Sequence, residues 1–115
     1  MTLILNCLLA LSMTAVLPAA HAQVNAGAAQ ALAEKHLCLA CHKVDAKQVG
    51  PSFGEVAKKY QGVADAPGIL IANIKKGGKG VWGTVPMPPV KNVPDEDLKT
   101  IVAWILSLSS PLRPK

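Results

Sequence analysis

The spacing of apolar residues along the chain predicts helices and no β-strands. The most regular pattern lies near the C-terminus, where apolar residues recur three or four positions apart: Leu98, Ile101, Val102, Ile105 and Leu108. This spacing places them on one face of a helix, and that face would be buried. Acidic residues occupy positions 95–97, in what would be the first turn, where the helix dipole favours negative charge. We therefore expect a helix over about residues 95–109, ending before Pro111.

Three further helices are predicted upstream. The first covers about residues 26–40, which are rich in Ala and Leu and contain no proline. The second begins at Ser52, which forms a capping box with Glu55, and is stopped by Gly62. The third opens with Pro67 near its first position and ends at a pair of glycines. No stretch alternates apolar and polar residues as a strand does, so the predicted fold class is all-α with loops.

The N-terminal segment differs from the rest because it contains no Asp, Glu, Lys or Arg before Asn25. An apolar run over residues 3–17 is followed by Pro18 and by Ala20-His21-Ala22, the small-residue pattern of a signal-peptidase site. We interpret residues 1–22 as a signal peptide that is cleaved on export, which leaves residues 23–115 as one domain. The alternative, an uncleaved membrane anchor, requires that Pro18 be tolerated within the spanning segment.

The candidate chemistry is concentrated in Cys38-Leu39-Ala40-Cys41-His42. The pattern C-x-x-C-H is typical of covalent haem attachment, in which both thiols form thioethers with the haem vinyl groups and the adjacent imidazole binds the iron. Two cysteines three positions apart lie on one side of a helical turn, so both can reach the edge of one flat ring. We therefore expect one haem c, attached through Cys38 and Cys41, with His42 as an axial iron ligand.

Two other kinds of site use the same residue types. A C-x-x-C pair in an exported protein can be a disulfide redox site, but the immediately following His42 favours haem. A zinc ion would have to take Cys38, Cys41, His42 and His36, and four ligands within seven residues give poor tetrahedral geometry. His36 is too near His42 to reach the opposite face of a haem, so we expect it at the surface.

A proline-rich loop should follow the third helix, because no helix accommodates three prolines within residues 86–89. Such a stiff loop suits the presentation of Met87 at one position, although a methionine can also simply fill a gap in the core. Met1 and Met13 lie in the predicted signal peptide, so Met87 is the methionine left to serve as second axial ligand. A His/Met pair closes both axial positions of the iron, which argues for electron transfer and against an enzyme.

The composition agrees with a haem protein of this kind. The chain of 115 residues has only two Trp, one Tyr and one Phe, and a haem would supply the large apolar body that its core lacks. The formal net charge of +5 is too small and too dispersed to indicate nucleic-acid binding. It suits redox protein partners with acidic docking surfaces, or an anionic surface.

Taken with three further segments, the haem motif resembles that of the small bacterial class I cytochromes c of the c-551/c-552 type. The segments are Gly50-Pro51, Gly80-Val81-Trp82-Gly83 and Pro86-Met87-Pro88-Pro89. The resemblance extends over about residues 28–109. It implies the compact class I cytochrome c fold, in which short helices wrap around one covalently bound haem.

The resemblance also implies roles for individual residues. The backbone carbonyl of Pro51 would hydrogen-bond His42 and orient it. Trp82 and Lys75 would lie near the haem propionates, and the Ala/Gly face of the first helix would cross the final helix near Trp104. Members of the family are soluble periplasmic carriers that pass one electron between respiratory complexes and terminal reductases or oxidases. We therefore expect a monomer in the periplasm, without stable membrane insertion once the signal peptide is removed.

Overall fold

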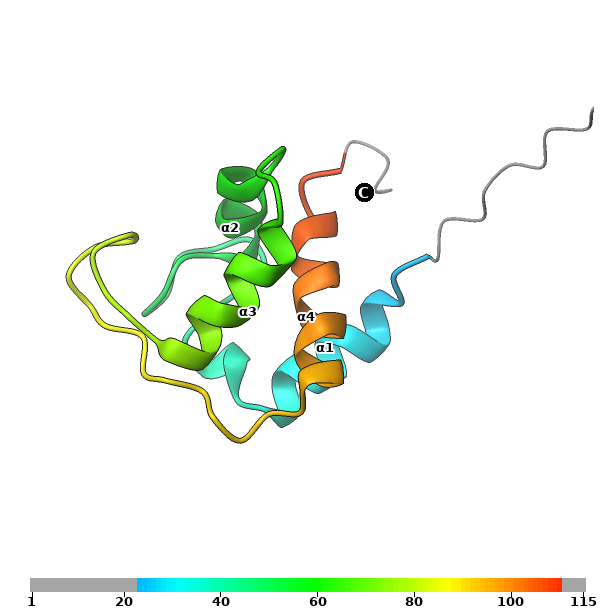
Figure 1. Ribbon diagram of the computed structural model, residues 1–115, viewed down its shortest axis with the longest axis horizontal. Helices are drawn as coiled ribbons and strands as arrows, with labels where there is room; N and C mark the ends of the chain where they lie inside the picture. The colour runs from blue at the N-terminus through cyan, green and yellow to red at the C-terminus, as the bar shows by residue number, and fades with distance from the viewer. Residues whose placement is uncertain (1–22, 111–115) are drawn as a thin grey trace, which may run out of the picture.

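The structure, a computed structural model, describes residues 23–110 (Figure 1). Its helices are α1 (Ala26–Lys35), the 3₁₀ helix η1 (Cys38–Ala40), α2 (Phe53–Tyr60), α3 (Ala66–Lys76) and α4 (Asp95–Ser107). These residues contain no β-strand, only an isolated bridge between Gly78 and Met87, so the predicted all-α class is confirmed. No helix within residues 23–110 is long and apolar enough to cross a membrane. The predicted signal peptide of residues 1–22 lies outside the described residues.

Helix α4 is the centre of the core and contacts α1, α2 and α3. Figure 1 shows it (orange) between α3 and α1. Its buried face consists of Leu98, Ile101, Val102, Trp104 and Ile105. Four of these positions are those that the helical spacing predicted, and Trp104 widens the buried stripe. The helix ends at Ser107, close to the predicted end near residue 109.

The crossing of α1 over α4 depends on small side chains. Ala29 and Ala33 are fully buried in the cluster that also contains Ile101 and Trp104. Because an alanine side chain extends no farther than Cβ, the two helices can approach each other closely. The family resemblance implied a face of small residues here. In the structure this face consists of Ala29 and Ala33, whereas Gly27 is exposed.

Helix α1 is shorter than predicted, because it ends at Lys35 and not near residue 40. Leu37 adopts the left-handed conformation, with φ 60° and ψ 17°, and this interrupts the helical backbone. The chain then forms a single 3₁₀ turn, so the two cysteines stand on a separate turn and not on the last turn of α1. The Cys41 N–H donates to the Cys38 carbonyl at 3.3 Å, which closes this turn.

Helix α2 begins with the capping box that the sequence predicts. The Glu55 N–H donates to Ser52 Oγ at 3.1 Å, and the Ser52 N–H donates to Glu55 Oε2 at 2.8 Å. The Ser52 backbone N–H, as the largest cause, and the Ser52 hydroxyl, which also donates to Glu55 Oε2, lower the pKa of Glu55. Helix α3 likewise carries Pro67 in its first turn and ends at Gly77, as predicted.

A hydrogen bond and an ion pair join the first turn of α4 to the ends of α1 and α3. His36 Nε2, just beyond α1, lies 2.7 Å from Asp97 Oδ2, and Lys75 of α3 pairs with Asp95. The expectation that His36 lies at the surface is therefore wrong, since its side chain is only 11% exposed. The acidic residues that favour the helix dipole thus also connect α4 to two neighbouring helices.

Replacing Glu55 by Gln is expected to lower the free energy of unfolding at neutral pH but not in acid. The folded pKa of Glu55 lies below its usual value of 4.5, so the carboxylate contributes stability above that pH. The contribution is lost as the pH falls through the folded pKa, because the protonated carboxyl no longer accepts the capping bonds as an anion. Urea unfolding followed by circular dichroism, at neutral pH and at about pH 3, measures the difference.

Glu34→Gln is the matched control, since it removes an exposed carboxylate of α1 instead of one in a cap. An equal loss of stability in both variants at neutral pH would contradict the role assigned to the capping box.

Candidate functional site

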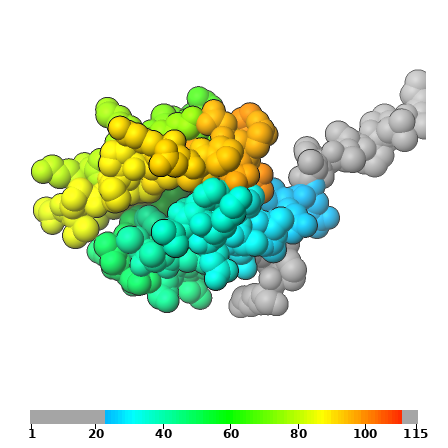
Figure 2. Space-filling view, turned by 90° about the horizontal axis from the view of Figure 1, so that it is seen from below, coloured from blue at the N-terminus to red at the C-terminus, as the bar shows by residue number. Residues whose placement is uncertain are grey.

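A cavity of about 480 Å³ opens between α3 with its following loop and the segment that runs from η1 into α2. Figure 2 shows the mouth as a groove between the loop of residues 80–93 (yellow to gold) and the segment around residues 40–55. Apolar side chains from α2, α3 and α4 line it, among them Val56, Leu70, Ile74, Ile101 and Ile105. Its size and apolar lining are those of a site for a cofactor.

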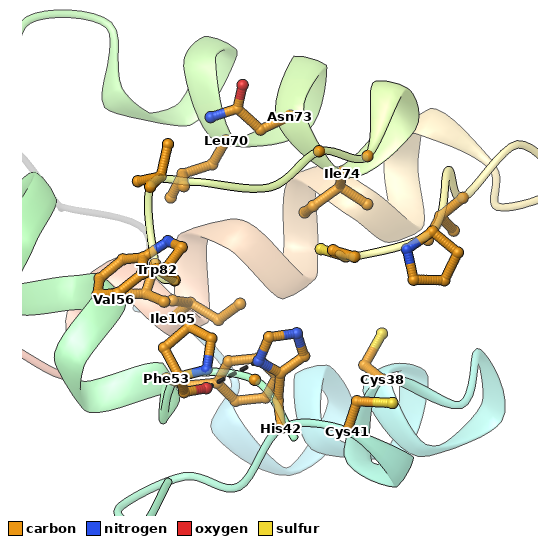
Figure 3. A pocket seen from close by; sticks show the side chains of 18 of the residues that line it. Cys38, Cys41, His42, Phe53, Val56, Leu70, Asn73, Ile74, Trp82 and Ile105 are labelled. Carbon is orange, nitrogen blue, oxygen red and sulfur yellow. Dashed lines mark hydrogen bonds between the residues drawn. The ribbon is translucent and has the colours of Figure 1, made fainter. Parts of the chain in front are cut away.

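Cys38 and Cys41 lie next to each other on one wall of this cavity (Figure 3). Both are free thiols, Cys38 half-buried and Cys41 exposed. Burial raises the pKa of Cys38, because desolvation disfavours the thiolate. The turn η1 therefore presents two sulfur atoms to one edge of the cavity, which is what attachment of a flat ring requires.

His42 is oriented by three neighbours. Its Nδ1 lies 2.8 Å from the Pro51 carbonyl oxygen, which can only accept, so Nδ1 carries the proton and Nε2 keeps a lone pair for a metal. The ring stacks on Phe53, with the ring centroids 5.3 Å apart and the planes inclined by 18°. A Cβ at Gly50 would lie 2.5 Å from His42 Cε1, so only glycine leaves room for the imidazole in this position.

Met87 lines the same cavity. It belongs to the loop of residues 80–93, which Figure 2 shows across the groove from the segment that contains His42. The Gly78 N–H donates to the Met87 carbonyl at 3.0 Å, and the Met87 N–H donates to the Gly78 carbonyl at 2.8 Å. Gly77 has φ 68°, and a Cβ there would lie 2.6 Å from the Met87 carbonyl oxygen. The backbone of Met87 is therefore held against the end of α3, and its side chain is half-buried.

Trp82 also lines the cavity, and Lys59 of α2 lies over its indole, with Nζ 5.4 Å from the ring centroid. Lys75 does not line the cavity, and its ammonium group pairs with Asp95. The lysines that line the cavity are Lys76 and Lys79. The positions of Trp82 and Lys75 near haem propionates stay predictions.

These side chains fit the haem that the sequence predicts. Two thiols stand at one edge, an imidazole nitrogen and a thioether sulfur come from segments on either side, and apolar surface lies between them. A zinc site finds no support within residues 23–110, where no three His, Cys, Asp or Glu side chains converge on a metal position. His36, the fourth ligand that zinc would need, is engaged by Asp97.

Sequence reasoning missed Phe53 and the steric roles of Gly50 and Gly77. Phe53 follows the capping residue of α2, and nothing in its local sequence indicates that it supports an imidazole. The available signals were indirect: Gly50 precedes Pro51, and Gly77 was identified only as the end of a helix. Gly50 is required by a ring eight residues before it and Gly77 by a carbonyl ten residues after it, and these separations exceed the span of a local helix or turn pattern.

Comparison with known proteins identifies the family. The family model of cytochrome c matches residues 26–109. Cytochrome c-552 of Hydrogenobacter thermophilus is 54% identical over 77 residues, which are 67% of this chain and 78% of that protein. Cytochrome c-552 of Nitrosomonas europaea is 50% identical over 93 residues, or 78% of this chain and 90% of that protein. The crystal structure of wild-type Nitrosomonas europaea cytochrome c552 matches with a TM-score of 0.67 and 48% identity, over 69% of this chain and 98% of the other.

The matched region contains η1, His42, the cavity walls and the loop with Met87. The family resemblance read from the haem motif and its accompanying segments is thereby confirmed. The chain belongs to the cytochrome c family, as a class I cytochrome close to the c-551 and c-552 electron carriers, which are not enzymes and hold one covalently bound haem c.

Proposed function

We propose that this protein is a soluble periplasmic carrier of single electrons, in which His42 and Met87 are the axial ligands of the haem iron. Cys38 and Cys41 bind the haem covalently, and the carrier passes electrons between respiratory complexes and a terminal reductase or oxidase. The observation that carries the proposal is that His42 and Met87 line one cavity from segments on either side of it.

The bound haem supplies an iron atom that alternates between the ferric and ferrous states. The chain must hold two ligands in positions that suit both states. His42 is held by Pro51 and Phe53, and the backbone of Met87 is held by Gly78. With both axial positions filled by side chains, no position is left for a substrate or a gas, which favours electron transfer over catalysis or sensing.

The environment of the cavity also affects the reduction potential. Its apolar walls lower the local dielectric, which disfavours the additional positive charge of ferric iron, and a Met ligand acts in the same direction. The hydrogen bond from His42 Nδ1–H to Pro51 makes the imidazole a stronger donor and partly offsets these effects. The balance favours a raised potential, which suits a carrier that delivers electrons to a terminal acceptor.

Acidic docking surfaces are expected on the redox partners because this chain is basic. The formal net charge is +5, and every charged residue follows Val24. A bound ferric haem with its two propionates adds about −1, so the holoprotein remains basic. Attraction between a basic carrier and an acidic partner speeds their encounter and weakens as salt is added.

Replacing Met87 by Ala is expected to abolish the weak far-red absorption that a Met sulfur–iron bond gives to the oxidised protein. The ferrous variant should also bind carbon monoxide rapidly, because one axial position is then open. Absorption spectra of both oxidation states, with and without carbon monoxide, provide the measurement. Thr84→Ala, at an exposed position of the same loop, is the control and should leave the spectra unchanged.

Either absence of this band from the wild-type protein or its persistence in the Met87→Ala variant would refute Met87 as an axial ligand.

Replacing Gly50 by Ala is expected to displace His42, and replacing Gly77 by Ala is expected to displace Met87. The added Cβ of Gly50→Ala would collide with the His42 ring, and that of Gly77→Ala with the Met87 backbone. Each variant should lose roughly 1–3 kcal/mol of stability, and Gly77→Ala should lose the far-red band at a lower temperature than the wild-type protein. Thermal unfolding followed by circular dichroism and by this band separates the two effects.

The control for both glycine variants is Gly27→Ala, whose Cβ would meet its nearest neighbour at 3.6 Å, an ordinary contact. If the circular dichroism signal and the far-red band of Gly50→Ala and Gly77→Ala were lost at the same temperatures as in the wild-type protein, the positions of His42 and Met87 would not need these glycines.

The intact mass of the exported protein is expected to equal that of residues 23–115 plus one haem, because the signal peptide is removed and both thiols are consumed. Cys38→Ala should retain one thioether, which the pyridine haemochrome spectrum reports as one unsaturated vinyl group. Cys7→Ala is the control, since Cys7 lies in the predicted signal peptide. A mass that retains residues 1–22 would support the uncleaved anchor, and a mass without haem would exclude the proposed function.

A further inference from the structure

Lys59 and Trp82 form a contact between two segments that line the haem cavity. Lys59 lies in α2, and Trp82 lies in the loop that follows α3. The Lys59 ammonium is 5.4 Å from the centroid of the indole, within the range at which a cation is attracted to the face of an aromatic ring. No Asp or Glu in residues 23–110 forms an ion pair with Lys59, so the indole is the partner of this ammonium group.

The stretch of residues 79–86 around Trp82 has few other attachments. In the part of the chain that the structure describes, no other hydrogen bond, ion pair or ring contact joins this stretch to a helix. Its backbone hydrogen bond is internal, from the Gly80 N–H to the Gly83 carbonyl at 2.8 Å. Gly80 and Gly83 have φ 99° and 121°, a region that glycine enters freely, so the backbone on either side of Trp82 can rearrange at low cost.

The base of this loop is fixed more firmly than its tip. The Met87 N–H and the Met87 carbonyl both bond to Gly78, so the base is held at the end of α3. Beyond this pair of hydrogen bonds, the contact between Lys59 and Trp82 joins the tip to α2. A movement of the tip away from α2 would therefore act on the backbone directly before Met87.

The contact lies at the end of the cavity that the cysteines do not reach. Figure 3 shows Trp82 on one side of the cavity and Cys38 and Cys41 on the other. The two cysteines would fasten a haem covalently at their own end, whereas the loop and α2 are joined at the far end by a noncovalent contact. The loop at that end depends on side-chain contacts to stay closed.

We propose that Lys59 is a positioning residue of the haem site, which holds the Trp82 indole and thereby keeps residues 79–86 closed over the cavity beside Met87. Lys59 does not line the cavity itself, so it acts through the indole. This inference rests on the proposed function, because the closed loop retains Met87 as the axial ligand.

The test measures how fast the loop opens, with imidazole as the probe and the ferric holoprotein as the sample. Imidazole takes the place of Met87 when the loop moves aside: the iron–sulfur bond breaks, an iron–nitrogen bond forms, and the iron stays ferric. At saturating imidazole, the rate at which the far-red band disappears reports this opening. We expect a rate about two- to fivefold higher in Lys59→Gln than in the wild-type protein, the range for loss of one exposed cation–π contact.

Lys58→Gln is the matched control, because it removes the same charge from the neighbouring exposed position of α2 and should leave the rate unchanged. Lys59→Arg should keep the wild-type rate, since a guanidinium also stacks on an aromatic face. A wild-type rate in Lys59→Gln would overturn the proposal. So would an equal increase in Lys58→Gln and Lys59→Gln, because the effect would then come from net charge and not from the indole.

Trp82→Leu determines whether Lys59 acts through the indole. In this background the loop has lost the aromatic face, so the further change Lys59→Gln should leave the rate as it is. If Lys59→Gln accelerated the exchange in Trp82→Leu as much as in the wild-type background, the ammonium would act on another group, such as a haem propionate, and the proposal would be wrong.

The spectrum of the wild-type protein separates this proposal from the proposed function. A ferric wild-type protein without the far-red band fails the proposed ligation, and the role of Lys59 with it. A wild-type protein that has the band, together with equal rates in the wild type, Lys58→Gln and Lys59→Gln, fails this inference alone.

Discussion

The hydrogen bond from His42 Nδ1–H to the Pro51 carbonyl, 2.8 Å long, is the contact on which the site depends. It selects the tautomer that leaves a lone pair on Nε2, as the proposed role of axial ligand requires, and it closes the segment between the haem motif and α2. Phe53, directly beyond the capping residue of α2, then lies against the imidazole. Phe53 in turn meets Trp104 edge-on, with the ring centroids 5.5 Å apart, so His42 is connected to the core of α4 through one aromatic side chain.

Helix α4 holds both sides of the cavity in relation to each other. Its buried face packs against α1, α2 and α3, and its first turn binds His36 at the end of α1 and Lys75 near the end of α3. The chain continues from α1 to the cysteines and from α3 to the loop with Met87. The two segments that carry the side chains proposed to bind the haem thus start from helices that are fixed to the same turn of α4.

Local patterns predicted the parts of this structure that depend on neighbouring residues in sequence. The helical spacing of α4, the capping box at Ser52 and the haem motif are all contained within a few turns of chain. The end of α1 was predicted too late, because Ala and Leu favour a helix and no local rule places a leucine in the left-handed conformation. The hydrogen bond between His36 and Asp97 and the position of Phe53 against the imidazole arise from contacts across the fold, so no pattern in one segment could indicate them.

Three residues next to the haem-binding segments occupy sterically tight or left-handed positions: Gly50, Gly77 and Leu37. Where close contact is internal, the chain uses glycine: Gly50 makes room for the His42 ring, and Gly77, with φ 68°, makes room for the Met87 backbone. These positions are set by backbone geometry, which a change in the charge of the iron would not displace. At Leu37 a leucine takes the left-handed backbone that a glycine would adopt at a lower cost, and this conformation ends α1. The strain at Leu37 therefore has a role within the monomer, because this residue separates the turn that carries Cys38 from α1.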